Sequence, residues 1–238
     1  WLNLASNIIS PPNDEEKDVF YPRCAIPSVI SSLYAVLSDE TDKETLRASY
    51  SALVRDDFSI VRRAVCSSLV DFAAKVAADK PAMIDQELTP LFEKLAKDDN
   101  EVVLVMVAEC YAPYANLLRQ AGGSLDRMVT LVRDALVHRS WRVRLAVAEN
   151  MARLPSIFSP DQIKTELMNG VFGVLRDIEA DVRQLVVPGI TSFIDVVGAQ
   201  TFATEAMPTF HLLTEDACVQ VRKELAKAAY SDVTMAPA

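Results

Sequence analysis

The two histidines of the chain, His138 and His211, are the side chains best suited to bind a transition metal or to move a proton near neutral pH. They are far apart in the sequence, and neither has a second ligand at the spacing of a metal motif such as H-E-x-x-H. We interpret both as structural or exposed residues. The sequence therefore predicts neither a metal site nor a cofactor site.

Four cysteines, Cys24, Cys66, Cys110 and Cys218, are the candidate thiol nucleophiles. They are widely spaced and form no C-x-x-C motif, so they predict neither a disulfide framework nor a zinc site. We expect reduced thiols, with Cys66 and Cys110 packed as small apolar side chains. Reduced cysteines are typical of a cytoplasmic protein, and a nuclear location is also left open.

Motifs that would indicate catalysis are missing from the sequence. Its six glycines do not gather into a phosphate-binding loop, and no G-x-S-x-G is present. Carboxylates are abundant, but they are spread over predicted helix surfaces and do not indicate a shared pocket. We predict that the chain is not an enzyme, and an enzyme with an appended helical array is kept as an alternative.

The charge of the chain bears on its partners. Its 238 residues carry a formal net charge of −9, whereas nucleic-acid binding normally needs a basic excess to neutralise phosphates. No segment reaches the roughly 18 uncharged apolar residues of a membrane span. We therefore expect neither nucleic acid nor membrane as a partner. The chain begins at Trp1 without a Met, and we expect it to be a piece of a longer protein.

A recurring pattern organises the chain. Five segments share an apolar stretch, a polar turn, a valine and a second apolar run, and the valines are Val61, Val103, Val143, Val182 and Val221. The valines are spaced by 42, 40, 39 and 39 residues. This period lies in the range of HEAT and armadillo arrays, in which stacked helix pairs bury apolar stripes that a single pair cannot bury.

Each repeat is interpreted as helix A, a short turn and helix B. The turns carry four acids and one histidine at the same position: Asp56, Asp98, His138, Asp177 and Asp216. Six residues later four arginines and one leucine follow: Arg62, Leu104, Arg144, Arg183 and Arg222. The acid can satisfy N–H groups at the start of helix B, and acid and arginine together predict a structural ladder of bonds from repeat to repeat. The ladder should break or be rerouted at Leu104.

The predicted fold class is all-α, an α-α superhelix (HEAT-repeat solenoid) of about five to six repeats. The predicted repeats span residues 43–80, 81–121, 122–158, 159–198 and 199–232. Residues 1–42 are interpreted as a partial repeat with a polar loop at Ser10–Asp18, and residues 233–238 as a frayed tail. Pro113 and Pro188 lie in helix B segments, where we expect kinks.

Three turn sequences give the chain a family resemblance: DDFSIVRRAV (56–65), SWRVR (140–144) and RDIEADVRQ (176–184). They resemble turns of the scaffolding A subunits of protein phosphatase 2A and occur in the same order. YPR (21–23) resembles a tripeptide that precedes the first of these turns in the family. The resemblance covers about residues 19–230. This sequence departs from the family at Leu104, at His138 and in a longer stretch between Tyr21 and Asp42.

The resemblance implies a non-catalytic scaffold of many repeats. In the family, regulatory subunits lie along the intra-repeat turns of the N-terminal and middle repeats, and the catalytic subunit docks on C-terminal repeats that this chain does not match. The expected partner is therefore a phosphatase regulatory subunit, with the catalytic subunit on repeats outside this chain. A nuclear transport carrier is the alternative HEAT or armadillo adaptor. It would need a ladder of Trp and Asn, and this chain has only two tryptophans.

The turns also supply the residues predicted to bind a partner. Trp141, between Arg139 and Arg142, has the composition of an interface hot spot, unless it folds over its own turn and stacks on an arginine. The full set is Asp57, Phe58, Arg63, Asp99, Glu101, Arg139, Trp141, Arg142, Glu179 and Asp181. For each acid taken alone, a solvated turn residue is the simpler interpretation.

Overall fold

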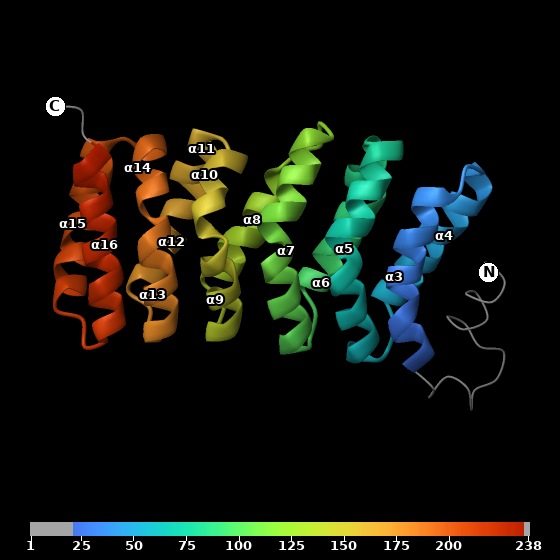
Figure 1. Cartoon of the computed structure of the whole chain (residues 1–238), viewed down its shortest axis with the longest axis horizontal. Helices are drawn as coiled ribbons and strands as arrows, with labels where there is room; N and C mark the ends of the chain where they lie inside the picture. The colour runs from blue at the N-terminus through green and yellow to red at the C-terminus, as the bar shows by residue number, and fades with distance from the viewer. Residues whose placement is uncertain (1–20, 236–238) are drawn as a thin grey trace. The chain divides into compact units, whose positions relative to one another are not determined.

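The computed structural model describes the backbone of residues 21–235 and the side chains through residue 229 (Figure 1). The predicted loop at Ser10–Asp18 lies outside this range, as do residues 236–238. Every element in the described part of the chain is helical, which confirms the predicted all-α class. The chain divides into two compact units, one ending at Ser124 and the other beginning at Leu125.

The first unit is built from two rows of helices. Its elements are α3 (Tyr21–Val36), α4 (Glu40–Val54), α5 (Ser59–Asp79), a wide π-type turn η1 (Ile84–Leu88), α6 (Thr89–Ala96) and α7 (Glu101–Gln120). Helix α5 packs against both α3 and α7, and α4 packs against α6 in the second row. The pairs α4–α5 and α6–α7 are therefore two repeats, and α3 takes the place of a helix B beside them.

The second unit repeats this arrangement with more interruptions. Its elements are α8 (Asp126–Leu136), α9 (Trp141–Glu149), η2 (Met151–Arg153), α10 (Leu154–Ile157), α11 (Pro160–Gln162), η3 (Ile163–Leu167), α12 (Met168–Leu175), α13 (Ala180–Gly189), α14 (Thr191–Val197), α15 (Ala199–Thr214) and α16 (Val219–Met235). Helix α13 packs against α9 and α16, while α12 packs against α8 and α15. The two rows are again a row of A helices and a row of B helices.

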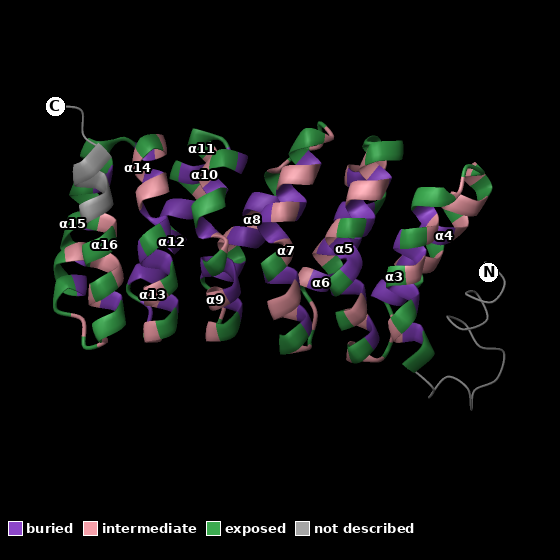
Figure 2. Cartoon of the chain, in the orientation of Figure 1, coloured by how far each residue is buried: buried purple, intermediate pink, exposed green. Residues whose placement is uncertain are grey.

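Aromatic side chains fill the interior of the first unit. Tyr50 stacks on Phe72 with ring centroids 4.2 Å apart, and Phe92 lies 4.4 Å from Tyr114. The Tyr50 hydroxyl donates to the Val65 carbonyl at 2.9 Å, so its polar atom is satisfied although the side chain is buried. Figure 2 shows buried and exposed residues on different sides of the longer helices, such as α5 and α7.

Proline affects the B helices in different ways. Helix α9 ends at Glu149, and Pro155 stands in the first turn of the short α10 that follows, where its missing N–H group is tolerated. Helix α7 continues through Pro113, whereas α13 ends at Gly189, directly after Pro188. The repeat boundaries remain predictions. Helix α16 continues through residues 233–235 of the predicted tail.

Helix α7 is long and apolar enough to be compared with a membrane span. By length and composition it could cross a membrane, and it is the one helix in the described part of the chain that could. It contains Glu101, Glu109 and Arg119, so the chain still has no segment of about 18 uncharged apolar residues. In its most apolar window 44% of the residues are buried, and the buried residues include Val103, Val107 and Tyr111. We attribute its apolar composition to packing against α5 and α6.

Candidate functional site

The intra-repeat turns have a common backbone geometry. In each of four turns the acid accepts a hydrogen bond from the N–H group two residues later, at 2.8–3.0 Å: Asp56 from Phe58, Asp98 from Asn100, Asp177 from Glu179 and Asp216 from Cys218. The acid therefore shapes the turn before helix B rather than capping the helix itself. In the second repeat Asn100 is the N-cap and accepts from the Val102 N–H group.

The ladder arginines bind two turns at once. Arg62 donates from Nε and Nη2 to both carboxylate oxygens of Asp98, at 2.6 and 2.8 Å. Its Nη1 donates to the carbonyls of Asp56 and Asp57 in its own turn, at 2.8 and 3.1 Å. One guanidinium thus joins its own turn to the next turn in the same unit through a two-pronged ion pair.

The same connection recurs twice in the second unit. Arg144 holds Asp177 at 2.5 and 2.7 Å, and Arg183 holds Asp216 at 2.7 and 2.9 Å. The Nη1 atoms of both arginines also donate to carbonyls of their own turns. Arg222 makes the carbonyl contacts, to Asp216 and Ala217, and no ion pair with a carboxylate in the described part of the chain.

Burial and the neighbouring arginines shift the pKa of the ladder acids in opposite directions. Burial of Asp98 and Asp177 disfavours their charged forms, but the arginines and the turn N–H groups outweigh it and hold the pKa of both carboxyls below the usual value. The hydrogen bond from Arg183 is the main cause of the lowered pKa of Asp216. These carboxylates are therefore ionised at neutral pH and strongly paired.

Arg23 is a ladder residue that the sequence analysis missed. Its Nε lies 2.7 Å from Asp56, and both partners are nearly buried. Its guanidinium also lies 5.4 Å from the centre of the Phe58 ring. The signal was present, because Arg23 precedes Arg62 by 39 residues, the same spacing that separates Arg144 from Arg183. Helix α3 is therefore helix B of the partial repeat.

The second and third repeats depart from the ladder chemistry. Leu104 has no polar side-chain atom and stands where the other repeats have arginine. His138 replaces the acid, and its Nδ1 accepts the turn hydrogen bond from the Ser140 N–H group at 3.1 Å. The histidine keeps the local shape of the turn without supplying a carboxylate.

The residues predicted to bind a partner differ in exposure. Most are exposed at or beside the turns: Asp57, Arg63, Asp99 and Glu101 in the first unit, and Arg139, Arg142 and Asp181 in the second. Phe58, Trp141 and Glu179 are half-buried. The Arg142 guanidinium lies 4.7 Å from the Trp141 ring centre, which is the stacked arrangement considered as the alternative. Their role in binding stays a prediction.

Two exposed aliphatic side chains in the second unit were also missed. Ile178 is 86% exposed at the tip of its turn, and Val137 is 68% exposed just before His138. A large apolar residue directly after the turn acid Asp177 was the available signal, because the other equivalent positions hold Asp57, Asp99, Arg139 and the small Ala217. Exposed apolar residues rimmed by polar ones are typical of interaction surfaces.

The described residues offer little for catalysis. No group of histidines, cysteines and acids among them could hold a metal ion. The four cysteines are free, and burial raises the pKa of Cys110 to about 11 and that of Cys66 further. These two thiols are therefore protonated at neutral pH and poor nucleophiles.

Comparisons with known proteins find relatives in sequence and in fold. The chain is 28% identical over 147 residues to a Schizosaccharomyces pombe protein named as the regulatory A-subunit of protein phosphatase PP2A, and 23% identical over 154 residues to the Saccharomyces cerevisiae protein of the same name. The matches cover 62% and 61% of this chain but 24% of each relative. The resemblance stated from the turns is thus found again among curated proteins. No family model matches the chain.

Solved structures agree on the fold. A computationally designed armadillo repeat protein for modular peptide recognition matches 97% of this chain and 99% of its own length, with a TM-score of 0.57 at 18% identity. The structure of Cex1p matches 99% of this chain and 44% of its own length, with a TM-score of 0.66 at 14% identity. These neighbours confirm the predicted class of helical-repeat solenoids.

Proposed function

We propose that this chain is part of a non-catalytic scaffold that holds a regulatory subunit of a protein phosphatase 2A-type holoenzyme through its intra-repeat turns. The two curated relatives, both named as regulatory A-subunits of PP2A, support the choice of assembly. The chain spans about a quarter of their length. In this proposal the catalytic subunit is bound by repeats of the full-length protein outside this segment.

One structural observation carries the proposal. The ladder arginines fix the backbone of the turns, while side chains such as Asp57, Arg139 and Ile178 remain exposed. A surface with a fixed backbone loses little conformational entropy on binding, which favours affinity. The mix of acids, arginines and exposed apolar residues suits a protein partner rather than a small substrate.

The proposal is tested first by affinity capture of the full-length protein from its own cell extract. A scaffold of this kind should recover a Ser/Thr phosphatase catalytic chain together with a regulatory subunit. Recovery of the protein without any phosphatase subunit would contradict it. Phosphatase activity of the purified chain alone would contradict the non-catalytic assignment.

Trp141 provides the residue-level test. Trp141→Ala should weaken binding of a purified PP2A regulatory subunit by about tenfold or more, as removal of an interface aromatic does, with little change in the melting temperature. Met207→Ala is the matched control, because Met207 is 59% exposed on α15 and belongs to no turn. Equal binding by both variants, or loss of helicity in Trp141→Ala, would remove Trp141 from the interface.

A further inference from the structure

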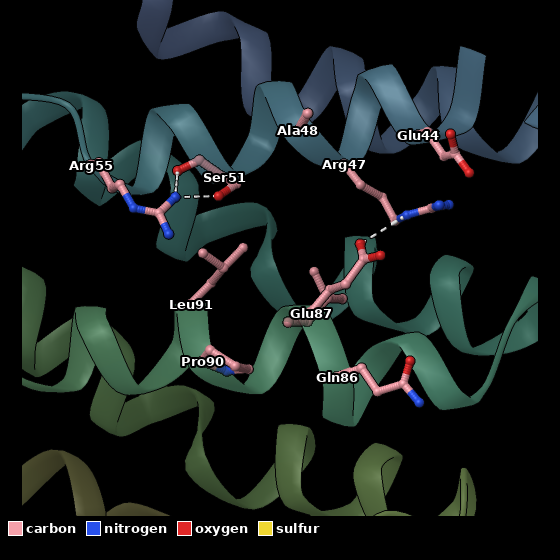
Figure 3. A pocket seen from close by; sticks show the side chains of 10 residues that line it. Glu44, Arg47, Ala48, Ser51, Arg55, Gln86, Glu87, Pro90 and Leu91 are labelled. Carbon is pink, nitrogen blue, oxygen red and sulfur yellow. Dashed lines mark hydrogen bonds and ion pairs between the residues drawn. The ribbon is translucent and has the colours of Figure 1, made fainter. Parts of the chain in front are cut away.

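A groove lies between the two A helices of the first unit. Its cavity of about 360 Å³ is lined on one side by α4 and on the other by η1 and α6. Figure 3 shows the two sides of the groove, with Ala48 and Ser51 on α4 and Arg55 at its C-terminal end opposite Leu91 and Pro90 of α6. The volume is at the lower end of the range for specific ligand sites, about 300–1,000 Å³.

Short side chains keep this groove open. Ala48 and Ser51 on α4 do not fill the space in front of Pro90, and Leu88 and Leu91 form an apolar floor with at most 5% exposure. At the other end of the groove Arg47 is held by Glu87 and Glu40, so its charge is already neutralised. The middle of the groove is therefore apolar.

A second cavity continues the groove towards the turns. It has about 410 Å³ and shares Arg55 with the first cavity. Three exposed cations line it, Arg55, Lys94 and Lys97. We refer to the two cavities together as the α4–α6 groove.

The acids and the cations that line the second cavity differ in whether they form ion pairs. Three acids that also line it are paired: Asp56 with Arg23, and Asp98 and Asp99 with Arg62. Arg55 donates to the Ser51 carbonyl at 2.8 Å, and neither it nor Lys94 and Lys97 forms an ion pair in the described part of the chain. Among the described residues, these three cations thus gather in one cavity beside a single acid without an ion pair, Asp57, although the net charge of the chain is −9.

The helix ends explain the position of these cations but not their grouping around a cavity. Arg55 and Lys97 are C-cap residues, and Lys94 is in the last turn of α6, where the helix dipole favours positive charge. On the turn side of the cavity Asp57 and Asp99 are exposed and would repel an acid, so an acidic ligand is expected to lie along the A helices.

We propose that the α4–α6 groove binds an acidic segment of a partner protein, with an aliphatic side chain on the Leu88 and Leu91 floor and carboxylates at Arg55, Lys94 and Lys97. Charge complementarity selects an acidic segment over a basic one, and the apolar floor selects it over a purely anionic chain. The groove reaches the turns at Asp57 and Asp99, so it adjoins the partner surface proposed there, but the cations and the apolar floor that the proposal uses lie on the A helices and at their C-terminal ends.

The test uses the whole chain and a displayed library of random short peptides. Peptides are selected on the wild-type chain, and the affinity of the best one is measured by fluorescence anisotropy. The selected peptides should combine acidic with aliphatic residues, and their binding should weaken as salt is raised. No selected peptide, or peptides without acidic residues, would overturn the proposal.

Charge reversal supplies the matched comparison. The groove variant Arg55→Glu/Lys94→Glu/Lys97→Glu should bind the selected peptide at least about tenfold more weakly. The control Arg153→Glu/Lys164→Glu/Lys223→Glu has the same change in net charge at three other exposed cations, and should stay within about threefold of wild type. If both variants lost peptide affinity equally, the binding would be non-specific electrostatic attraction, and the proposed site would be wrong.

An uncharged variant keeps the test decisive if the triple variant fails to fold. Ala48→Leu adds volume at an exposed helix position inside the groove and leaves every charge in place. It should weaken the selected peptide while helicity by circular dichroism is unchanged. Unchanged peptide affinity would mean that the floor of the groove is not used. Trp141→Ala should bind the peptide as wild type does, which separates this proposal from that for the turns.

Discussion

Asp98 and Asp99 are neighbours in the sequence but lie in different environments. The Asp98 side chain is 6% exposed and the Asp99 side chain 92%, although Arg62 contacts both. We predict that Asp98→Asn lowers the free energy of unfolding by about 2 kcal/mol, because it removes a charged partner from a nearly buried ion pair. Asp99→Asn should change it by less than about 0.5 kcal/mol. Urea unfolding of both variants measures the difference, and equal effects would contradict the ladder as a source of stability.

The lowered pKa values of the ladder acids predict how stability depends on pH. Asp98, Asp177 and Asp216 have lower pKa values in the folded chain than the usual 3.8, so their pairing contributes fully above about that pH. The contribution is lost as the pH falls through the lower folded values. Urea midpoints measured from neutral to acid pH should decline below about pH 4, and less steeply for Asp177→Asn/Asp216→Asn. An unchanged acid decline in that variant would assign the dependence to other groups.

At the residue level the repeat pattern predicted most ladder residues but not Arg23 or the cations of the groove. The turn acids and arginines follow from a fixed spacing, so their positions could be read before their contacts were known. Arg23 was missed because the positions of the turn acid and the valine hold Lys17 and Pro22 in its repeat, which breaks the pattern there. The unpaired state of Lys94 and Lys97 depends on which acids other residues already hold, and no local pattern contains that information.

At the scale of the element, Gly198 separates α14 from α15 with a φ of 88°. A Cβ atom there would meet no atom within 4 Å, so the backbone conformation alone determines the effect of a substitution. We predict that Gly198→Ala lowers the free energy of unfolding by about 1 kcal/mol.

Gly173 in α12 is the matched comparison, because a Cβ atom there also meets open space but the backbone is helical. Gly173→Ala should raise the free energy of unfolding by about 0.5–1 kcal/mol, since alanine loses less conformational freedom in a helix. Thermal melts of the two variants should shift in opposite directions. A shift in the same direction would contradict the role assigned to the positive φ.

Element boundaries show where prediction from sequence ends. Apolar periodicity predicted helices, but not that α9 would end at Glu149 or that wide turns would precede α6 and α12. Proline was an ambiguous signal, since α7 continues through Pro113 while α13 ends after Pro188. Whether a helix continues through a proline depends on how it packs against neighbouring helices, and the sequence of the helix alone does not contain that information.

At the scale of the whole molecule, the first unit contains its own ladder and its own aromatic interior. The links Arg23–Asp56 and Arg62–Asp98 both lie within residues 21–124. We predict that a fragment of residues 21–124 is helical and unfolds cooperatively in urea. A fragment of residues 21–80 keeps Arg62 but lacks Asp98, and should be markedly less stable. Lack of helicity in the longer fragment would show that the unit depends on the rest of the chain.

In four turns the residue after the acid or histidine, the turn tip, accepts a hydrogen bond from a ladder arginine through its backbone carbonyl. Arg62, Arg144, Arg183 and Arg222 donate to the carbonyl oxygens of Asp57, Arg139, Ile178 and Ala217, whose side chains are an acid, a base, a branched alkane and a methyl group. A carbonyl is the same in every amino acid, so mutation can exchange the tip side chain while the turn keeps its shape. Lineages could therefore acquire new binding preferences at these positions without first evolving a more stable fold.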